Sequence, residues 1–157
     1  MTRHFRRVAV PTPALIATAI LGVGCAVWQL TLLAGPCNYL PGVAIPCYVA
    51  SGSLFWWAVS VTKGRLAACG QGCVSAQVVT EGPYRYVRHP FYSAYNLAWI
   101  AGWLTTGSWE LLATAVVMAT VYESYAREEE CGFMEGPLEG AYSEYRRRTG
   151  RYLPGIR

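Results

Sequence analysis

Two polar clusters border a hydrophobic hairpin in this 157-residue chain. The first is GPYRYVRHPFYSAY at residues 82–95, and the second is YESYAREEE at residues 122–130. A tight hairpin brings its two ends together in space. The sequence therefore predicts that residues of the first cluster meet glutamates of the second: Arg88, His89 and Tyr92 at one end, and Glu128, Glu129 and Glu130 at the other.

The residue types in these clusters suit a ligand that carries several charged groups. Pro90 is a favourable first residue of a helix, and the backbone N–H groups after it form an anion site. The guanidinium group of Arg88 can donate two parallel hydrogen bonds to a carboxylate or a phosphate. Glutamates accept hydrogen bonds from an ammonium or from ribose hydroxyls, and tyrosine rings stack on bases or face a cation. The tyrosines of the first cluster are Tyr84, Tyr86, Tyr92 and Tyr95.

S-adenosylmethionine has a carboxylate, an ammonium, a ribose, a base and a sulfonium, so it would use all of these groups. A nucleotide would use much of the same set. A third interpretation is anchoring at a membrane surface, where tyrosine, tryptophan and arginine are common. The sequence predicts no metal site, because the C-x-x-x-C pair Cys69 and Cys73 has no histidine nearby to complete a ligand set.

The composition is that of a membrane protein. Hydrophobic residues make up 54% of the chain and charged residues only 14%, whereas a soluble domain has about 25% charged residues. No charged residue occurs between Val8 and Thr62, and a span needs about 20 apolar residues. We predict an all-α fold in one membrane domain, residues 1–157, with four transmembrane helices and a cytoplasmic C-terminal helix. The expected spans are residues 11–34, 43–62, 91–105 and 109–126.

The basic residues indicate how these spans are oriented. All 13 Lys and Arg residues precede the first span, lie between the second and third, or follow the fourth, and the other two turns contain none. Cytoplasmic loops collect Lys and Arg, so both termini and the active site are expected in the cytoplasm. The net charge of +4 is thereby explained by topology, so we expect the lipid bilayer as a partner and no nucleic acid. On the opposite face, the sequence leaves open whether Cys37 and Cys47 form a disulfide.

The chain after the fourth span is expected to form a cytoplasmic helix over residues 128–147, because its many charges exclude a fifth span. Gly136-Pro137 should interrupt this helix. Four hydrophobic residues recur near the helical period and are expected to pack under the hairpin and close the pocket: Phe133, Leu138, Tyr142 and Tyr145.

The order of these motifs resembles the isoprenylcysteine carboxyl methyltransferase and phospholipid methyltransferase superfamily of integral membrane methyltransferases. The resemblance covers residues 76–154: GPYRYVRHPFY, a hydrophobic hairpin, a Glu-Glu pair followed by Phe133, and RTGRYLP. It implies S-adenosylmethionine-dependent methyl transfer to a small lipophilic or lipid acceptor. Residue by residue, it implies that the cofactor contacts Gln77, Val78, Val79, Tyr84, His89, Pro90, Tyr92 and Glu129. Arg88 is expected to join them because of its guanidinium group.

Methyl transfer from a sulfonium requires positioning and exclusion of water more than acid–base chemistry. A general base is needed only for an acceptor that arrives protonated, and Glu130 or His89 could then serve. The sequence departs from the isoprenylcysteine enzymes at Tyr125, where they have an arginine near the substrate, and this departure weighs against a prenylcysteine acceptor. The alternatives are a nicotinamide-dependent membrane reductase on a related scaffold and a non-enzymatic membrane protein.

The predicted topology can be tested with reporter fusions after residues 38, 75 and 107. Because all basic residues are expected on one face, the three fusions should report outside, inside and outside. An inside signal at residue 38 or 107 contradicts the four-span topology.

Overall fold

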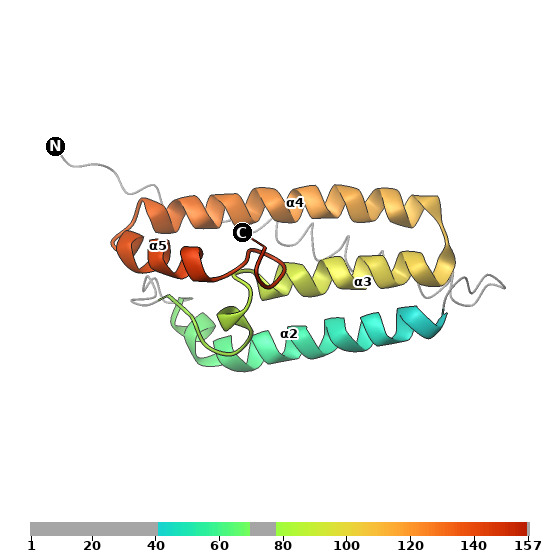
Figure 1. Cartoon of the computed structure of the whole chain (residues 1–157), viewed down its shortest axis with the longest axis horizontal. Coiled ribbons are helices and arrows are strands. Elements are labelled where there is room, and N and C mark those ends of the chain that lie inside the picture. The colour runs from blue at the N-terminus through green and yellow to red at the C-terminus, as the bar shows by residue number, and fades with distance from the viewer. Residues whose placement is uncertain (1–40, 70–77, 157) are drawn as a thin grey trace.

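The computed structural model describes residues 41–69 and 78–156, and this part of the chain is built from helices (Figure 1). The elements are α2 (Pro41–Cys69), the short 3-10 helix η1 (Gly82–Arg85), α3 (Pro90–Thr106), α4 (Trp109–Met134) and α5 (Glu139–Arg148). Over the described residues there is no strand, only an isolated bridge between Val87 and Gly150. The all-α prediction is confirmed for this part.

The long helices α2, α3 and α4 lie side by side, and the short helix α5 folds back at the end of α4 (Figure 1). The Ser51 hydroxyl on α2 donates a hydrogen bond of 2.7 Å to the backbone oxygen of Ala94 on α3, in a buried position. Between α3 and α4 the core consists of Trp99, Leu111 and Met118. These contacts hold α3 between its two neighbours.

The turn of the α3–α4 hairpin lies where the sequence predicts it. Gly107 ends α3 in the left-handed conformation, with a φ of 64°, which a glycine adopts without steric cost. Ser108 then caps α4, because its side chain accepts a hydrogen bond from the backbone N–H of Leu111. The hairpin therefore returns the chain directly, and the start of α3 lies beside the end of α4.

One described helix segment, Gly42–Thr62 on α2, is long and apolar enough to cross a membrane, and it coincides with the second predicted span. Its large hydrophobic side chains are exposed at Val43, Ile45, Val49, Trp56 and Trp57. With 17 residues, α3 is shorter than the roughly 20 residues that a perpendicular span needs. The first predicted span lies outside the described residues, and so does Cys37, whose pairing with Cys47 the sequence leaves open.

The tail differs from the prediction in where its first helix begins. Residues 128–134 continue α4 rather than starting a new helix, because no proline interrupts the chain before Pro137. The predicted interruption is confirmed, since α4 ends at Met134 and α5 begins at Glu139. Three of the four residues predicted to pack contact one another: the rings of Phe133 and Tyr142 stack at 4.8 Å, and Tyr145 meets Tyr142 edge-on. That they close a cofactor pocket stays a prediction.

Candidate functional site

The loop before α3 is held in place by a glycine and a proline. Gly82 has a φ of 59°, and a Cβ atom there would lie 2.5 Å from a side-chain carbon of Val61 on α2. The buried Pro83 carbonyl then accepts hydrogen bonds from the backbone N–H groups of Tyr86 and Val87. The loop therefore rests on α2 and delivers Arg88 and His89 to the first turn of α3.

The C-terminal segment, residues 149–156, pairs with this loop. The backbone N–H of Arg88 donates to Gly150 O at 2.8 Å, and that of His89 donates to Arg151 O at 3.1 Å. Gly150 is required by the turn that follows, since a Cβ atom there would lie 1.9 Å from the backbone oxygen of Leu153. The segment is thereby fixed across the start of α3 (Figure 1).

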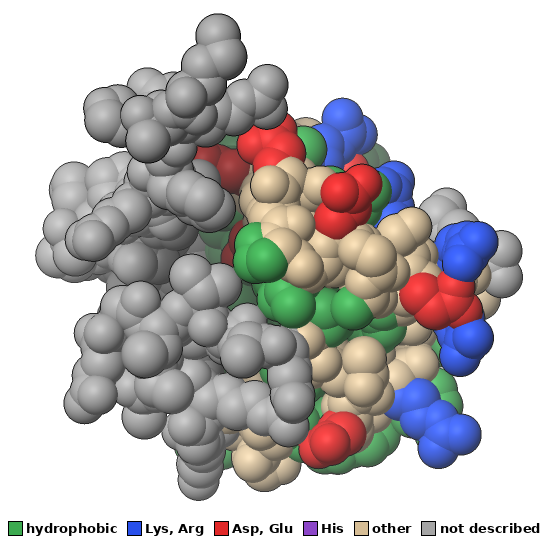
Figure 2. Space-filling model, turned by 90° about the vertical axis from the view of Figure 1, so that its left-hand side faces the viewer, with side chains coloured by type: hydrophobic (Ala, Val, Ile, Leu, Met, Phe, Trp, Pro, Cys, Tyr) green, Lys and Arg blue, Asp and Glu red, His purple; other side chains and the backbone are tan. Residues whose placement is uncertain are grey.

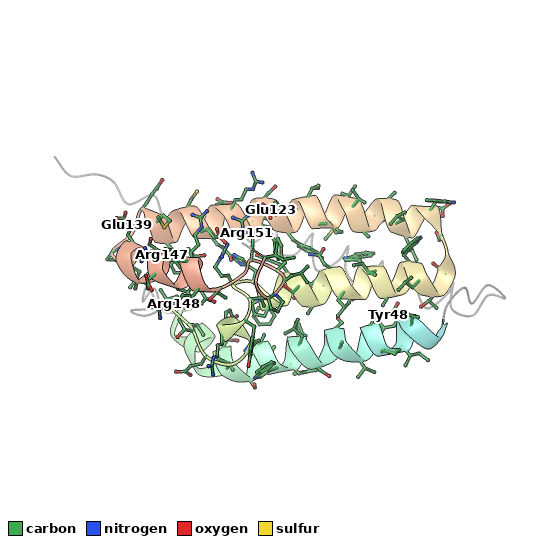
Figure 3. All side chains as sticks on the ribbon, viewed as in Figure 1. Tyr48, Glu123, Glu139, Arg147, Arg148 and Arg151 are labelled. Atoms are coloured by element: carbon green, nitrogen blue, oxygen red, sulfur yellow. The ribbon has the colours of Figure 1, made fainter. Side chains whose placement is uncertain are left out.

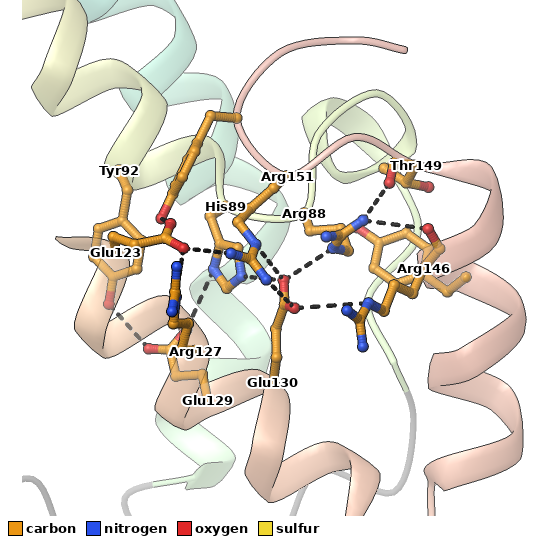
Figure 4. Close-up of polar contacts among 12 residues, drawn as sticks. Arg88, His89, Tyr92, Glu123, Arg127, Glu129, Glu130, Arg146, Thr149 and Arg151 are labelled. Carbon is orange, nitrogen blue, oxygen red and sulfur yellow. Dashed lines mark hydrogen bonds and ion pairs between the residues drawn. The ribbon is translucent and has the colours of Figure 1, made fainter. Parts of the chain in front are cut away.

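Glu130 is the centre of the polar network (Figure 4). Its side chain is only 5% exposed, and Arg88 Nε lies 3.0 Å and His89 Nε2 3.2 Å from Oε1. Two nitrogens of Arg151 also donate to this carboxylate: Nε lies 3.2 Å from Oε1, and Nη2 lies 2.8 Å from Oε2. Cationic side chains from the loop and from the C-terminal segment therefore converge on one carboxylate of α4.

The charge state of Glu130 follows from these partners. Burial alone raises the pKa of Glu130, but hydrogen bonds from His89, Arg151 and Arg88 outweigh burial and hold the pKa well below its usual range. The carboxylate is therefore ionised, and it is a weak proton acceptor. Its arrangement suits a buried counter-ion.

Glu129 is adjacent in sequence but points in another direction, because successive residues of a helix are rotated by about 100°. Its side chain is 51% exposed. One carboxylate oxygen accepts a hydrogen bond from Tyr92 Oη at 3.1 Å, and the other lies 3.4 Å from His89 Nδ1. His89 also stacks on the ring of Tyr92, with 5.6 Å between the ring centres.

His89 thus bridges two carboxylates, one through each ring nitrogen. Only the protonated imidazole can donate from both nitrogens. Burial lowers the pKa of His89, but the hydrogen bonds to Glu129 and Glu130 outweigh it and raise the pKa above its ordinary value. The raised pKa favours the doubly donating cation.

Arg88 is buried and joins three parts of the chain. Besides Glu130, its Nη1 donates to two backbone oxygens at the C-terminal end of α5, those of Arg146 at 3.2 Å and Thr149. The last carbonyls of a helix have no intrahelical partner, so Arg88 caps α5 and holds it against α4.

The structure confirms one predicted set of contacts and contains a second set that the sequence did not predict. Arg88, His89 and Tyr92 do meet Glu129 and Glu130, whereas Glu128 is exposed and takes no part in these contacts. The missed residues are those that the C-terminal segment adds. Arg151 forms an ion pair with Glu123 (Figures 3 and 4). Tyr152 Oη donates to the same carboxylate at 2.8 Å. Glu123 could have been recognised from the sequence, because a charged residue inside an apolar stretch needs a partner.

The remaining candidate cofactor residues lie around this centre or outside the described part. Gln77 is not among the described residues, while Val78 and Val79 are half-buried in the loop before η1. Pro90 is buried as the first residue of α3. Burial and the negative charge of Glu129 raise the pKa of Tyr84 to about 12.

A cavity of about 720 Å³ opens between α4, α5 and the C-terminal segment, and Glu129 is not in its wall. Among the described residues, Arg88 is the only sequence-predicted site residue that lines it. The cavity is lined by Arg88, Glu123, Met134, Ser143, Arg146, Arg147, Arg151, Tyr152, Leu153 and Ile156.

The comparison with known families decides the relationship of this chain. A family model described as phospholipid methyltransferase matches residues 42–136. The chain belongs to the phospholipid methyltransferase family. No curated protein and no solved structure matches it.

Membership of the phospholipid methyltransferase family confirms the resemblance and indicates methyltransferase activity on lipid-like substrates. The matched region begins in α2 and ends between α4 and α5. It therefore contains the His89, Glu129 and Glu130 cluster, whereas Arg151 and the other residues of the C-terminal segment lie beyond it.

Replacing Glu130 by glutamine should destabilise the protein. Arg88, His89 and Arg151 would lose their common counter-ion, and breaking a buried ion pair costs about 3–5 kcal/mol. The pKa of His89 should fall, because one of the two carboxylates that raise it is gone. Thermal unfolding and histidine NMR titration measure the two effects, and the second histidine, His4, is assigned by a His4→Asn variant.

The matched control for this test is Glu128→Gln, which removes an exposed charge two residues away. Equal unfolding temperatures and equal His89 titrations for Glu130→Gln and Glu128→Gln would contradict the network.

The stability of the wild type should depend on pH in a definite direction. The raised pKa of His89 stabilises the fold below about pH 6.5, and this contribution is lost as the pH rises through the folded-state pKa. The lowered pKa of Glu130 stabilises the fold above about pH 4.5, and this contribution is lost on acidification.

Proposed function

We propose that this chain transfers a methyl group from S-adenosylmethionine to a lipid-like acceptor at the cytoplasmic face of a membrane. The observation that carries the proposal is the half-exposed Glu129 carboxylate beside His89 and Tyr92, within the region matched by the phospholipid methyltransferase family. Members of this family generally use S-adenosylmethionine.

The donors and acceptors around Glu129, which we call the Glu129 side, fit this cofactor. Glu129 supplies an acceptor for its ammonium group. The backbone N–H groups of Phe91 and Tyr92 belong to the first turn of α3 and have no intrahelical partner, so they suit its carboxylate. The rings of Tyr92 and Tyr122 stack at 5.4 Å and offer aromatic surface for a base or a sulfonium.

Electrostatics favours this side over the cavity near Glu130. S-adenosylmethionine carries a sulfonium, an ammonium and a carboxylate, so its net charge is positive. Four guanidinium groups line the cavity, whereas three carboxylates pair with them, those of Glu123, Glu130 and Glu144. The Glu129 side instead offers a carboxylate that Tyr92 and His89 hold in place and that is still half open to solvent.

The chain's own residues would act mainly by positioning. The bound cofactor would supply an electrophilic methyl group, and the protein must align the acceptor with it and exclude water. Protonated His89 fixes the orientation of the Glu129 carboxylate. Glu130, with its low pKa, anchors His89 and is a weaker base than the sequence analysis assumed. We therefore assign it a positioning role.

The membrane arrangement belongs to the same proposal. We place four spans in the bilayer, with both termini and the cluster on the cytoplasmic side. The candidate span Gly42–Thr62 and the basic residues that follow it support this orientation. The acceptor would then reach the cluster from the lipid, as expected for a lipophilic small molecule.

Binding is the direct test of the proposal. The purified full chain should bind S-adenosylmethionine in calorimetry and should not bind nicotinamide nucleotides. Glu129→Gln and His89→Ala should each weaken binding by roughly tenfold to a hundredfold, because a hydrogen bond to a charged group contributes about 1.5–3 kcal/mol.

Glu128→Gln is the control, since it removes the same charge from the neighbouring exposed position. Unchanged affinity in both cluster variants would place the cofactor elsewhere. Binding of a nicotinamide nucleotide in its place would support the reductase alternative, and binding of neither would favour a non-enzymatic membrane protein.

A further inference from the structure

The cavity between α4, α5 and the C-terminal segment has a strongly basic wall. Arg146 and Ser143 lie one turn apart on α5 and both line it, together with the next residue, Arg147. Arg151 lies across from them on the C-terminal segment, and Arg88 is buried at its base. Figure 2 looks at the end of the molecule that carries α5 and shows blue side chains along its edge.

Part of this basic wall has unused donor capacity. Arg88 and Arg151 are occupied by Glu130, Glu123 and backbone oxygens, and Arg147 forms an ion pair with Glu144. Arg146 differs, because its only ion pair within the described residues is a 3.9 Å approach of Nε to Glu130. Its side chain is 49% exposed, so its two terminal nitrogens are available to an anion in the cavity.

Part of the wall is apolar. Met134, Tyr152, Leu153 and Ile156 contribute to it, and the side chains of Leu153 and Ile156 are largely exposed although they are hydrophobic. A ligand that fills the cavity therefore meets both guanidinium groups and hydrocarbon.

We propose that this cavity is a binding site for a phosphate group, separate from the cofactor site. Its four guanidinium groups exceed the three carboxylates that pair with them, which favours an anion. Arg146, Arg147 and the Ser143 hydroxyl present donors on one helix face, and several donors suit an anion with three or more oxygens better than a carboxylate. The phosphate can belong to a lipid headgroup, with the apolar wall against the lipid, or to free phosphate.

This inference goes beyond the proposed function and does not rest on it, because binding of the phosphate probes is measured without a methyl donor. The full chain in a neutral detergent is titrated with dihexanoyl phosphatidic acid, with inorganic phosphate and with dihexanoylglycerol, which lacks the phosphate. We expect the phosphatidic acid to bind and dihexanoylglycerol not to bind. Arg146→Gln should weaken phosphatidic acid binding about tenfold, the loss expected for one charge-assisted hydrogen bond.

Arg148→Gln is the matched control, because Arg148 carries the same charge on α5, pairs with Glu144 and does not line the cavity. Its affinity should stay at the wild-type value. Tighter binding of the lipid than of inorganic phosphate, with the difference lost in Leu153→Ser, identifies a lipid headgroup as the ligand. Equal binding of the two identifies free phosphate, and both results support the site.

Three results would overturn the proposal. The first is equal affinity for phosphatidic acid in Arg146→Gln and Arg148→Gln. The second is an absence of binding by both phosphate probes. The third is displacement of bound phosphate by S-adenosylmethionine, because the cavity would then be part of the cofactor site. Each result can be told apart from a failure of cofactor binding, which is measured in a separate titration.

Discussion

A single buried carboxylate determines how the functional end of this protein is assembled. An ionised glutamate with a 5% exposed side chain is unfavourable unless cations and hydrogen-bond donors surround it. Glu130 meets this requirement with Arg88 and His89 from the loop before α3 and Arg151 from the C-terminal segment. The loop, the end of α4 and the C-terminal segment are therefore held together by one charge, and α5 is attached to the same group through Arg88.

The neighbouring glutamates divide the surface of α4 into two chemically different sides. Glu129 remains half open to solvent and lies among aromatic rings, whereas Glu130 is enclosed by cations. A cationic cofactor and an anionic group would therefore favour different sides of the same helix. His89 connects the two sides, because its ring lies between both carboxylates.

The parts of this arrangement that depend on local sequence were predictable. The hairpin turn follows from Gly107 and Ser108, and the contact of Arg88, His89 and Tyr92 with the glutamates follows from the hairpin alone. The recurrence of hydrophobic residues near the helical period likewise indicated that Phe133 and Tyr142 are packing residues. The separation of Glu129 and Glu130 into exposed and buried groups was not predictable, since it depends on the C-terminal segment. Arg151 is 21 residues from Glu130 in the sequence. It reaches Glu130 because the backbone of residues 150 and 151 pairs with that of residues 88 and 89, and no periodicity in the sequence predicts that pairing.

The most direct test of this account is a double-mutant cycle between Glu130 and Arg151. The free energy of unfolding would be measured for the wild type, Glu130→Gln, Arg151→Gln and the double variant in the same detergent. If Glu130 holds the C-terminal segment in place, the two substitutions should be coupled by about 1–3 kcal/mol, as expected for residues in one network. Effects that add to within about 0.5 kcal/mol would show that the segment is held by other contacts and would contradict the account.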